Sequence, residues 1–183
     1  MIKETQNKRF SIKDIVYIAL FAALIAVCSW IYIPMTVPFT LQTFAIFVTV
    51  GLLGLRRGTG AVLVYIGMGA LGLPVFSGFM GGFGVLLGYT GGYIIGFVFT
   101  ALSIGVITKI FGQKPLILVI SMVVGLAICY IFGTAWFMVV YTQKVGAVGL
   151  ATVLSWCVLP FLIPDAIKII IATIIVSRVS KHV

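Results

Sequence analysis

The chain has 183 residues and a formal net charge of +9, and 62% of its residues are hydrophobic while only 8% are charged. With a mean hydropathy of +1.31, it has too little polar surface to cover a soluble globule of this length. The composition therefore predicts an integral membrane protein, and the length allows one compact bundle of about six spans at roughly 20 residues each. The basic residues lie between apolar runs, so we interpret the positive charge as a sign of membrane topology and do not expect nucleic-acid binding.

The first predicted span covers residues 11–31 and follows a polar, basic N-terminus. Its apolar stretch has no small-residue cleavage site, so we expect a retained helix and not a signal peptide. Within it, Ala19 and Ala23 form one small-xxx-small repeat, and Ala22 and Ala26 form a second. In lipid, such a face lets another helix approach closely. The spacing alone leaves open whether that helix belongs to a partner or to this chain's own bundle.

Two unusually short apolar segments come next. An uncharged loop at 34–40, rich in proline and threonine, leads to Gln42, whose amide carries both donor and acceptor groups. The segments 41–55 and 59–73 are about 15 residues each, or roughly 22 Å of helix, which is short of a hydrocarbon core of about 30 Å. An arginine pair separates them. Transporter folds tend to place substrate sites at short spans of this kind.

The stretch at 78–96 is rich in glycine. Glycine allows positive φ and close approach of the backbone to a ligand, so the part at 78–84 could offer N–H groups to a carboxylate. We therefore place Phe79, Gly81 and Gly82 in the candidate binding site. The stretch has neither the dinucleotide-binding nor the P-loop signature.

A full span is predicted at 86–110. From Gly88 onward, helix packing through small residues is an alternative explanation for the glycines. Tyr89 and Tyr93 nevertheless bring hydroxyl groups to an otherwise apolar wall, and we include both in the candidate site. The two roles are compatible.

Two more segments complete the chain. A span is predicted at 116–141, followed by a short loop with the lone Lys144. The segment at 147–178 is too long for one straight span, and Pro160 and Pro164 predict a break within it. The predicted fold is thus an all-α bundle of six transmembrane helices whose last helix is broken.

The last segment holds Asp165, the only acidic residue after position 14, and Lys168 three residues later. On a helix, residues three apart share a face, so the carboxylate and the ammonium can pair. A charge inside the membrane costs at least roughly 2.5 to 3.5 kcal/mol on insertion scales, and an ionisable pair there is by default a site hypothesis. The alternative is that the charges only neutralise each other, or that Lys168 snorkels to the cytoplasmic surface. The two prolines favour a pocket, because irregular backbone at membrane depth is tolerated where protein buries it or it lines a cavity.

Basic residues are unevenly divided between the two sides of the predicted bundle. One side holds Lys3, Lys8, Arg9, Lys13, Arg56, Arg57, Lys109, Lys114, Arg178 and Lys181, whereas the loops on the opposite side hold only Lys144. This positive-inside bias predicts that both termini are cytoplasmic. The loops at 34–40 and 78–84 would then face outward and roof a pocket that contains Asp165 and Lys168.

Enzymatic chemistry finds little support in the sequence. Outside the polar N-terminus there is one carboxylate, the only histidine is His182, and Cys28, Cys129 and Cys157 are isolated in apolar segments. We therefore expect neither an enzyme nor a metal site. A channel is also poorly supported, because conduction paths normally show rings or series of polar residues. Binding of a small, partly polar molecule remains.

Four landmarks occur in order along nearly the whole chain: VPFTLQT from Val37, GLPVF from Gly72, GYTGGYIIGF from Gly88 and PFLIPDAIK from Pro160. Together they resemble the landmarks of BioY, the biotin-binding S components of energy-coupling factor (ECF) transporters. Tyr89 departs from the pattern, since the family's usual run is G-P-T-G-G-Y.

The resemblance implies one substrate-binding domain over 1–183, with a cytoplasmic tail at 1–10, in the plasma membrane of a prokaryotic cell. It implies a subunit that captures biotin from outside and docks with a transmembrane T component carrying two ATP-hydrolysing subunits. This chain would itself bind no ATP and need no cofactor. The resemblance also implies that the four alanines of the first helix form the docking surface.

The chemistry of biotin suits the candidate residues. Its ureido group offers two N–H donors and a carbonyl acceptor, and its carboxylate needs a cation or N–H groups. We expect Asp165 to accept a ureido N–H. These two ends lie roughly 10 Å apart in an extended ligand, whereas one helical turn advances about 5.4 Å, so we favour Lys168 at the ureido carbonyl and the glycine-rich loop at the carboxylate.

Alternatives remain for both the pose and the function. Lys168 could instead meet the carboxylate of biotin. The ligand could be another vitamin, such as thiamine or riboflavin. A helical membrane subunit that assembles with a partner and binds no solute is the alternative from another functional class.

Overall fold

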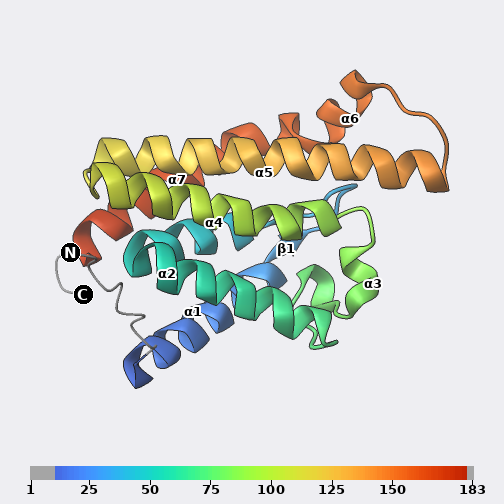
Figure 1. Cartoon of the computed structure of the whole chain (residues 1–183). Coiled ribbons are helices and arrows are strands. Elements are labelled where there is room, and N and C mark those ends of the chain that lie inside the picture. Colours follow the sequence, from blue (N-terminus) through green and yellow to red (C-terminus); the bar gives the residue numbers. More distant parts are fainter. Residues whose placement is uncertain (1–10, 181–183) are drawn as a thin grey trace, which may run out of the picture.

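The computed structural model describes residues 11–180, which are almost entirely helical (Figure 1). The helices are α1 (Ile12–Trp30), α2 (Gln42–Ala70), α3 (Phe83–Leu86), α4 (Gly91–Phe111), α5 (Pro115–Lys144), α6 (Leu150–Cys157) and α7 (Leu162–Val179). Two short 3₁₀ turns, η1 (Ser77–Phe79) and η2 (Leu159–Phe161), lie between them. Strands β1 (Tyr32–Ile33) and β2 (Phe39–Thr40) form a small antiparallel pair. The predicted tail at 1–10, together with Lys181 and His182, lies outside the described residues.

Within residues 11–180, five helical segments are long and apolar enough to cross a membrane. They are α1, α2, α4, α5 and the combined segment Leu150–Val179 that contains α6, η2 and α7. The prediction of a helical, multi-pass membrane protein is thereby confirmed.

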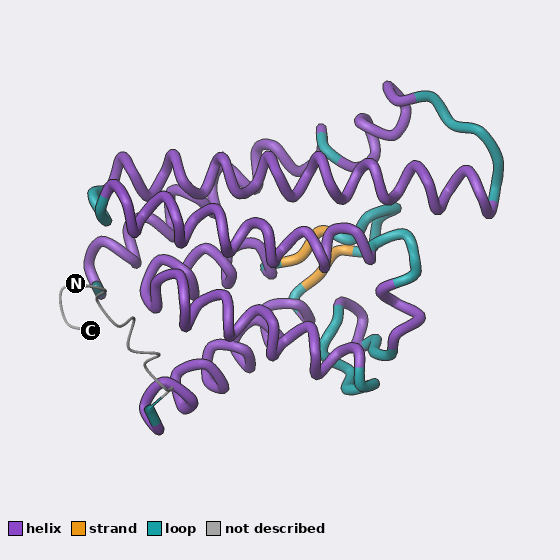
Figure 2. Tube along the Cα trace, viewed as in Figure 1, coloured by secondary structure: helices purple, strands orange, loops and turns teal. Residues whose placement is uncertain are grey.

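α2 is bent back on itself at Gly54. The backbone there has φ +72° and ψ −174°, a conformation open essentially only to glycine. A β-carbon on Gly58 would stand 2.8 Å from the α-carbon of Val50, whereas residues eight apart in a straight helix are about 12 Å apart. The arms 42–53 and 55–70 are therefore antiparallel, as the tube in Figure 2 shows. They correspond to the two short apolar segments predicted from the sequence.

Local signals explain where the long helices begin and end. Ser11 caps α1, because its hydroxyl accepts the N–H of Asp14 at 3.2 Å while the Asp14 carboxylate accepts the N–H of Ser11 at 2.9 Å. α4 ends at Gly112, whose φ of +86° favours glycine. α5 begins directly with Pro115, which needs no N–H partner in the first turn.

Glycines let α4 and α5 pack closely over most of their length. A β-carbon on Gly92 of α4 would collide with Trp136, and one on Gly133 of α5 would collide with the ring of Tyr93. The packing explanation for the glycines after Gly88 therefore holds at these contacts.

Three boundaries differ from the sequence prediction. The span predicted at 86–110 begins at Gly91, because the chain turns so tightly after α3 that a β-carbon on Gly91 would collide with the Leu86 carbonyl. α5 continues to Lys144, beyond the predicted end at 141. The loop predicted at 34–40 includes β2, which pairs with β1.

The last span is broken, as predicted. α6 ends at Cys157, the chain passes through η2 with Pro160, and α7 begins at Leu162. Pro164 falls in the first turn of α7, where no intrahelical hydrogen bond is lost. This geometry places Asp165 in the first turn of α7 and Lys168 one turn later.

The bundle has one end that is rich in basic residues. The start of α1, the bend of α2, the connection from α4 to α5 and the end of α7 lie together, at the left of Figure 1. These segments carry Lys13, Arg56, Arg57, Lys109, Lys114 and Arg178, and we call this the basic end. The C-terminus of α5, with Lys144, lies at the opposite end.

Candidate functional site

A cavity of about 520 Å³ lies inside the bundle. This volume is in the range of about 300 to 1,000 Å³ that is usual for small-molecule sites. The lining is mostly apolar, and it includes residues from the 34–40 segment, α2, α4, α5 and α7. Several of these elements contribute polar side chains that can form hydrogen bonds or ion pairs with a ligand.

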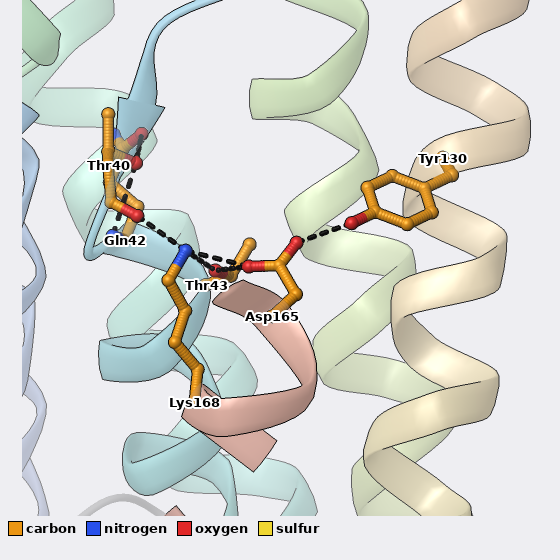
Figure 3. Close-up of polar contacts among 6 residues, drawn as sticks. All are labelled: Thr40, Gln42, Thr43, Tyr130, Asp165 and Lys168. Carbon is orange, nitrogen blue, oxygen red and sulfur yellow. Dashed lines mark hydrogen bonds and ion pairs between the residues drawn. The ribbon is translucent and has the colours of Figure 1, made fainter. Parts of the chain in front are cut away.

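Asp165 and Lys168 form a buried ion pair in the cavity wall. Their exposed fractions are 2% and 6%, and the Lys168 Nζ lies 2.7 Å from the Asp165 Oδ1 (Figure 3). Both line the cavity. A buried charge is tolerated when it is paired and hydrogen-bonded, which is the state of both residues here.

Lys168 ties α7 to the start of α2. Its ammonium donates to the backbone carbonyl of Thr40 at 2.7 Å and to the hydroxyl of Thr43 at 3.1 Å, in addition to Asp165. The Nζ also stands 4.2 Å from the centroid of the Phe39 ring. All three ammonium hydrogens thus have acceptors.

Asp165 is held by donors from three elements. The Tyr130 hydroxyl of α5 donates to Oδ2 at 2.5 Å, and the Thr43 hydroxyl of α2 donates to Oδ1 at 3.2 Å, beside the Lys168 bond (Figure 3). Each carboxylate oxygen can accept about two hydrogen bonds, so Oδ2 keeps capacity for one more donor. The site can therefore accept an N–H group from a ligand. Sequence reasoning did not assign Tyr130 or Thr43 to the site.

Gln42 lines the cavity, and both the nitrogen and the oxygen of its side-chain amide are hydrogen-bonded. Its Nε2 donates to the Tyr65 hydroxyl at 2.5 Å, and its Oε1 accepts from the Thr40 hydroxyl at 3.0 Å. The residue is 6% exposed. These bonds fix the first turn of α2 next to the strand that Lys168 contacts.

Tyr89 and Tyr93 also line the cavity. The Tyr93 hydroxyl shares a hydrogen bond with the Thr134 hydroxyl at 3.1 Å. The Tyr89 ring packs on Phe137 with centroids 5.6 Å apart, and the Lys144 Nζ stands 5.3 Å from the Tyr89 centroid. These rings supply the aromatic wall that a ring system in the cavity would contact.

A family model for the BioY family matches residues 3–183 of this chain. The chain belongs to the BioY family. The biotin transporter BioY of Thermotoga maritima is 38% identical over 170 residues, which cover 92% of this chain and 96% of that protein. The probable biotin transporter BioY of Pyrococcus horikoshii is 34% identical over 171 residues, covering 93% and 98%. The family resemblance is thereby confirmed.

The fold also matches a solved structure from this functional group. The S-component for biotin from an ECF-type ABC transporter superposes with a TM-score of 0.84 and 29% sequence identity. The match covers 100% of this chain and 96% of that one.

In this BioY-family chain, the three residues assigned from the glycine-rich stretch lie in different places. Gly81 lines the cavity, and its N–H has no hydrogen-bond partner among residues 11–180. Phe79 is 60% exposed and stacks on Trp30 with centroids 5.0 Å apart. Gly82 donates its N–H to the Gly69 carbonyl at 2.7 Å, so that N–H is not available to a ligand. Phe79 and Gly82 are outside the cavity lining.

The four alanines of α1 also divide into two groups. Ala22 and Ala26 are 0% and 5% exposed and pack inside the chain's own bundle. Ala19 and Ala23 are exposed. Residues three and four apart share a side of a helix, so the four alanines are neighbours on α1, and the boundary between the buried and the exposed surface runs between the two repeats. Only the Ala19 and Ala23 face is open to a partner in this structure, so Ala22 and Ala26 are corrected to core positions.

Proposed function

We propose that this chain is the biotin-binding S component of an ECF-type vitamin transporter. It captures biotin from outside and delivers it inward when docked to the ATP-driven module. The observation that carries the proposal is the buried Asp165–Lys168 pair, with Tyr130, in the wall of a cavity of about 520 Å³. The family membership and the names of the relatives indicate the same ligand.

The ureido group of biotin binds at the ion pair. Asp165 Oδ2 accepts a ureido N–H, and the oxygen of Tyr130, which donates to Asp165, has lone pairs for a second contact. Lys168 reaches the ureido carbonyl by exchanging one of its present acceptors. Thr43, the most distant at 3.1 Å, is the partner that is exchanged.

The biotin carboxylate binds at the glycine-rich segment. We place the carboxylate at Gly81, because the N–H of Gly81 has no partner among residues 11–180 and an N–H group is the donor that a carboxylate needs where no second cation lines the cavity. A buried cation is present only at the ion pair among the described lining residues. The rings of Tyr89 and Tyr93 contact the body of the ligand.

The bend in α2 supports a topology of six membrane crossings. Counting its two arms separately, the single domain crosses the membrane six times, with both termini in the cytoplasm and the basic end facing inward. The protein lies in a prokaryotic plasma membrane as one multi-pass domain over 1–183. The opposite end, with the 34–40 segment and α3, faces the source of biotin.

The partners are a transmembrane T component and two ATP-hydrolysing subunits. This chain supplies the ligand site and needs no cofactor of its own. The exposed Ala19 and Ala23 face of α1 docks on the T component, because small side chains let helices approach closely in lipid.

Isothermal titration of the purified protein in detergent tests the proposed ligand. We expect tight, one-to-one binding of biotin without a partner protein, and no binding of thiamine or riboflavin. Binding of one of those two vitamins in place of biotin would overturn the assignment of the ligand. A folded protein that binds none of them would overturn the S-component proposal and favour an assembly subunit.

A further inference from the structure

A second concave region lies on the outer surface of the bundle. It is a groove of about 620 Å³ between α1, the second arm of α2 and α4, and it shares no lining residue with the cavity described above. Its lining includes Ile18, Arg56, Thr59, Gly60, Leu63 and Val106. Neither the proposed biotin site nor the Ala19 and Ala23 face accounts for it.

The shape of the groove suits a hydrocarbon chain. Gly60 has no side chain to fill the groove, and a β-carbon at this position would lie 3.2 Å from the Cδ1 of Ile18. Leu63 of α2 and Val106 of α4 both line the groove and are 53% and 42% exposed. An acyl chain lying between them would contact apolar side chains along its length.

One part of the groove is polar. Arg56 and Thr59 are three residues apart on the second arm of α2 and share a face of that helix. Thr59 is 9% exposed, and its hydroxyl has no hydrogen-bond partner within residues 11–180. A threonine in a helix has two accessible χ1 rotamers, so a side-chain rotation can offer this hydroxyl to an acceptor in the groove. A phosphate or ester oxygen is such an acceptor.

The charge around this part of the groove is positive. Arg56 is at the basic end, together with Arg57 and Lys114. Asp14 also lies at this end, and its carboxylate pairs with Arg57 at 2.5 Å. With the orientation proposed above, the basic end meets the cytoplasmic leaflet, which carries anionic lipids.

We infer that the groove is a binding site for one anionic phospholipid, with an acyl chain between α2 and α4 and the phosphate beside Arg56 and Thr59. The apolar walls select a lipid chain, and the guanidinium selects a negative headgroup. The site is separate from the vitamin cavity, so its occupancy does not depend on biotin.

Native mass spectrometry of the purified full-length chain tests this site. The protein is titrated with phosphatidylglycerol and, separately, with phosphatidylcholine of the same acyl chains. We expect one phosphatidylglycerol to be retained about fivefold or more over phosphatidylcholine, the preference expected from one cation near an anionic headgroup. Equal retention of the two lipids by the native chain would overturn the inference.

Two variants locate the site. Arg56→Gln should abolish the preference for phosphatidylglycerol, whereas Lys114→Gln, at the same end but outside the groove, should keep it. Val106→Trp should fill the groove and reduce retention of both lipids, whereas Val123→Trp, 49% exposed on α5, should not. All four variants should bind biotin as the native chain does, which shows that they are folded. Unchanged lipid retention in Val106→Trp together with lost vitamin uptake would overturn the inference and assign the groove to a partner protein.

Discussion

The carboxylate of Asp165 is fixed before any ligand arrives. Lys168, Thr43 and Tyr130 each donate to it, and they belong to α7, α2 and α5. A carboxylate that is already oriented loses little further freedom when a ligand N–H binds. The same contacts join three parts of the bundle, so the site and the packing of the helices depend on each other.

Replacing Tyr130 by phenylalanine tests the contribution of its hydroxyl. The change removes one hydrogen bond to a charged group, which contributes about 1.5 to 3 kcal/mol. We expect biotin affinity to fall by about tenfold to 100-fold, measured by isothermal titration.

The control for this change is Tyr141→Phe. Tyr141 is also in α5, where it packs on Phe137, but it is outside the cavity lining. It should leave the affinity unchanged. Equal affinity of Tyr130→Phe and the native chain would exclude Tyr130 from the binding site.

At this scale the sequence predicted the ion pair but not its surroundings. Asp165 and Lys168 are three residues apart in one helix, so a local rule places them together. Tyr130 reaches Asp165 from α5, and the register between two helices depends on side-chain packing along their whole contact. Tyr130 could be recognised as a polar residue in an apolar span, but its partner could not.

At the scale of the elements, the bend in α2 depends on one glycine. Gly54 has φ +72° and ψ −174°, with nothing near its missing β-carbon, so the requirement comes from the backbone alone. The sequence indicated two short segments here because an arginine pair interrupts the apolar run. It did not indicate which residue makes the turn, since several glycines are nearby.

Gly54→Ala should lower the free energy of unfolding by about 1 to 3 kcal/mol, because a side chain is strained in this conformation. Thermal unfolding in detergent measures the effect. Gly67→Ala is the matched control, since Gly67 also has open space around it but has no positive φ. That change should raise stability by about 0.5 to 1 kcal/mol. A similar gain for Gly54→Ala would contradict the proposed role of the bend.

α1 is the least buried of the five candidate spans and has two distinct faces. Ala23→Trp places a large side chain on the exposed face, so the fold and biotin binding should be preserved while uptake with the T component is lost. Ala22→Trp places the same side chain in the core and should destabilise the chain itself by about 1 to 3 kcal/mol.

Uptake assays in cells that express the complete transporter distinguish these outcomes, with biotin binding by the purified subunit measured in parallel. Ile120→Trp, 46% exposed on α5, controls for a bulky exposed residue. Normal uptake with Ala23→Trp would exclude this face of α1 from docking.

At the scale of the whole molecule, the distribution of charge supports the proposed orientation in the membrane. The described basic residues outside the cavity gather at one end, with Lys144 at the other. The sequence predicted this division because it depends only on counting charges between apolar runs. It could not predict the starting residue of α4 or the pairing of β1 with β2, which depend on contacts between distant parts of the chain.

Cysteine labelling in intact cells tests the orientation. Gln143→Cys, near the C-terminus of α5, should react with a membrane-impermeant maleimide added outside. Gln113→Cys, at the basic end, should react only after the membrane is permeabilised. The native chain is the control, since Cys28, Cys129 and Cys157 are all buried. Labelling of Gln113→Cys in intact cells would reverse the proposed orientation.

The central claim is that the buried Asp165–Lys168 pair binds biotin, and that its role is not limited to the mutual neutralisation of two buried charges. The most direct test is the biotin affinity of the double variant Asp165→Asn, Lys168→Met, compared with the native chain by isothermal titration. Removing both charges together leaves no unpaired charge in the core, so the variant should fold with a thermal stability close to that of the native chain. Its biotin binding should weaken by at least about 1.5 to 3 kcal/mol, because the hydrogen bond from the ureido group to a charged acceptor is lost. A folded double variant that binds biotin as tightly as the native chain would contradict the claim and reduce the pair to a structural role.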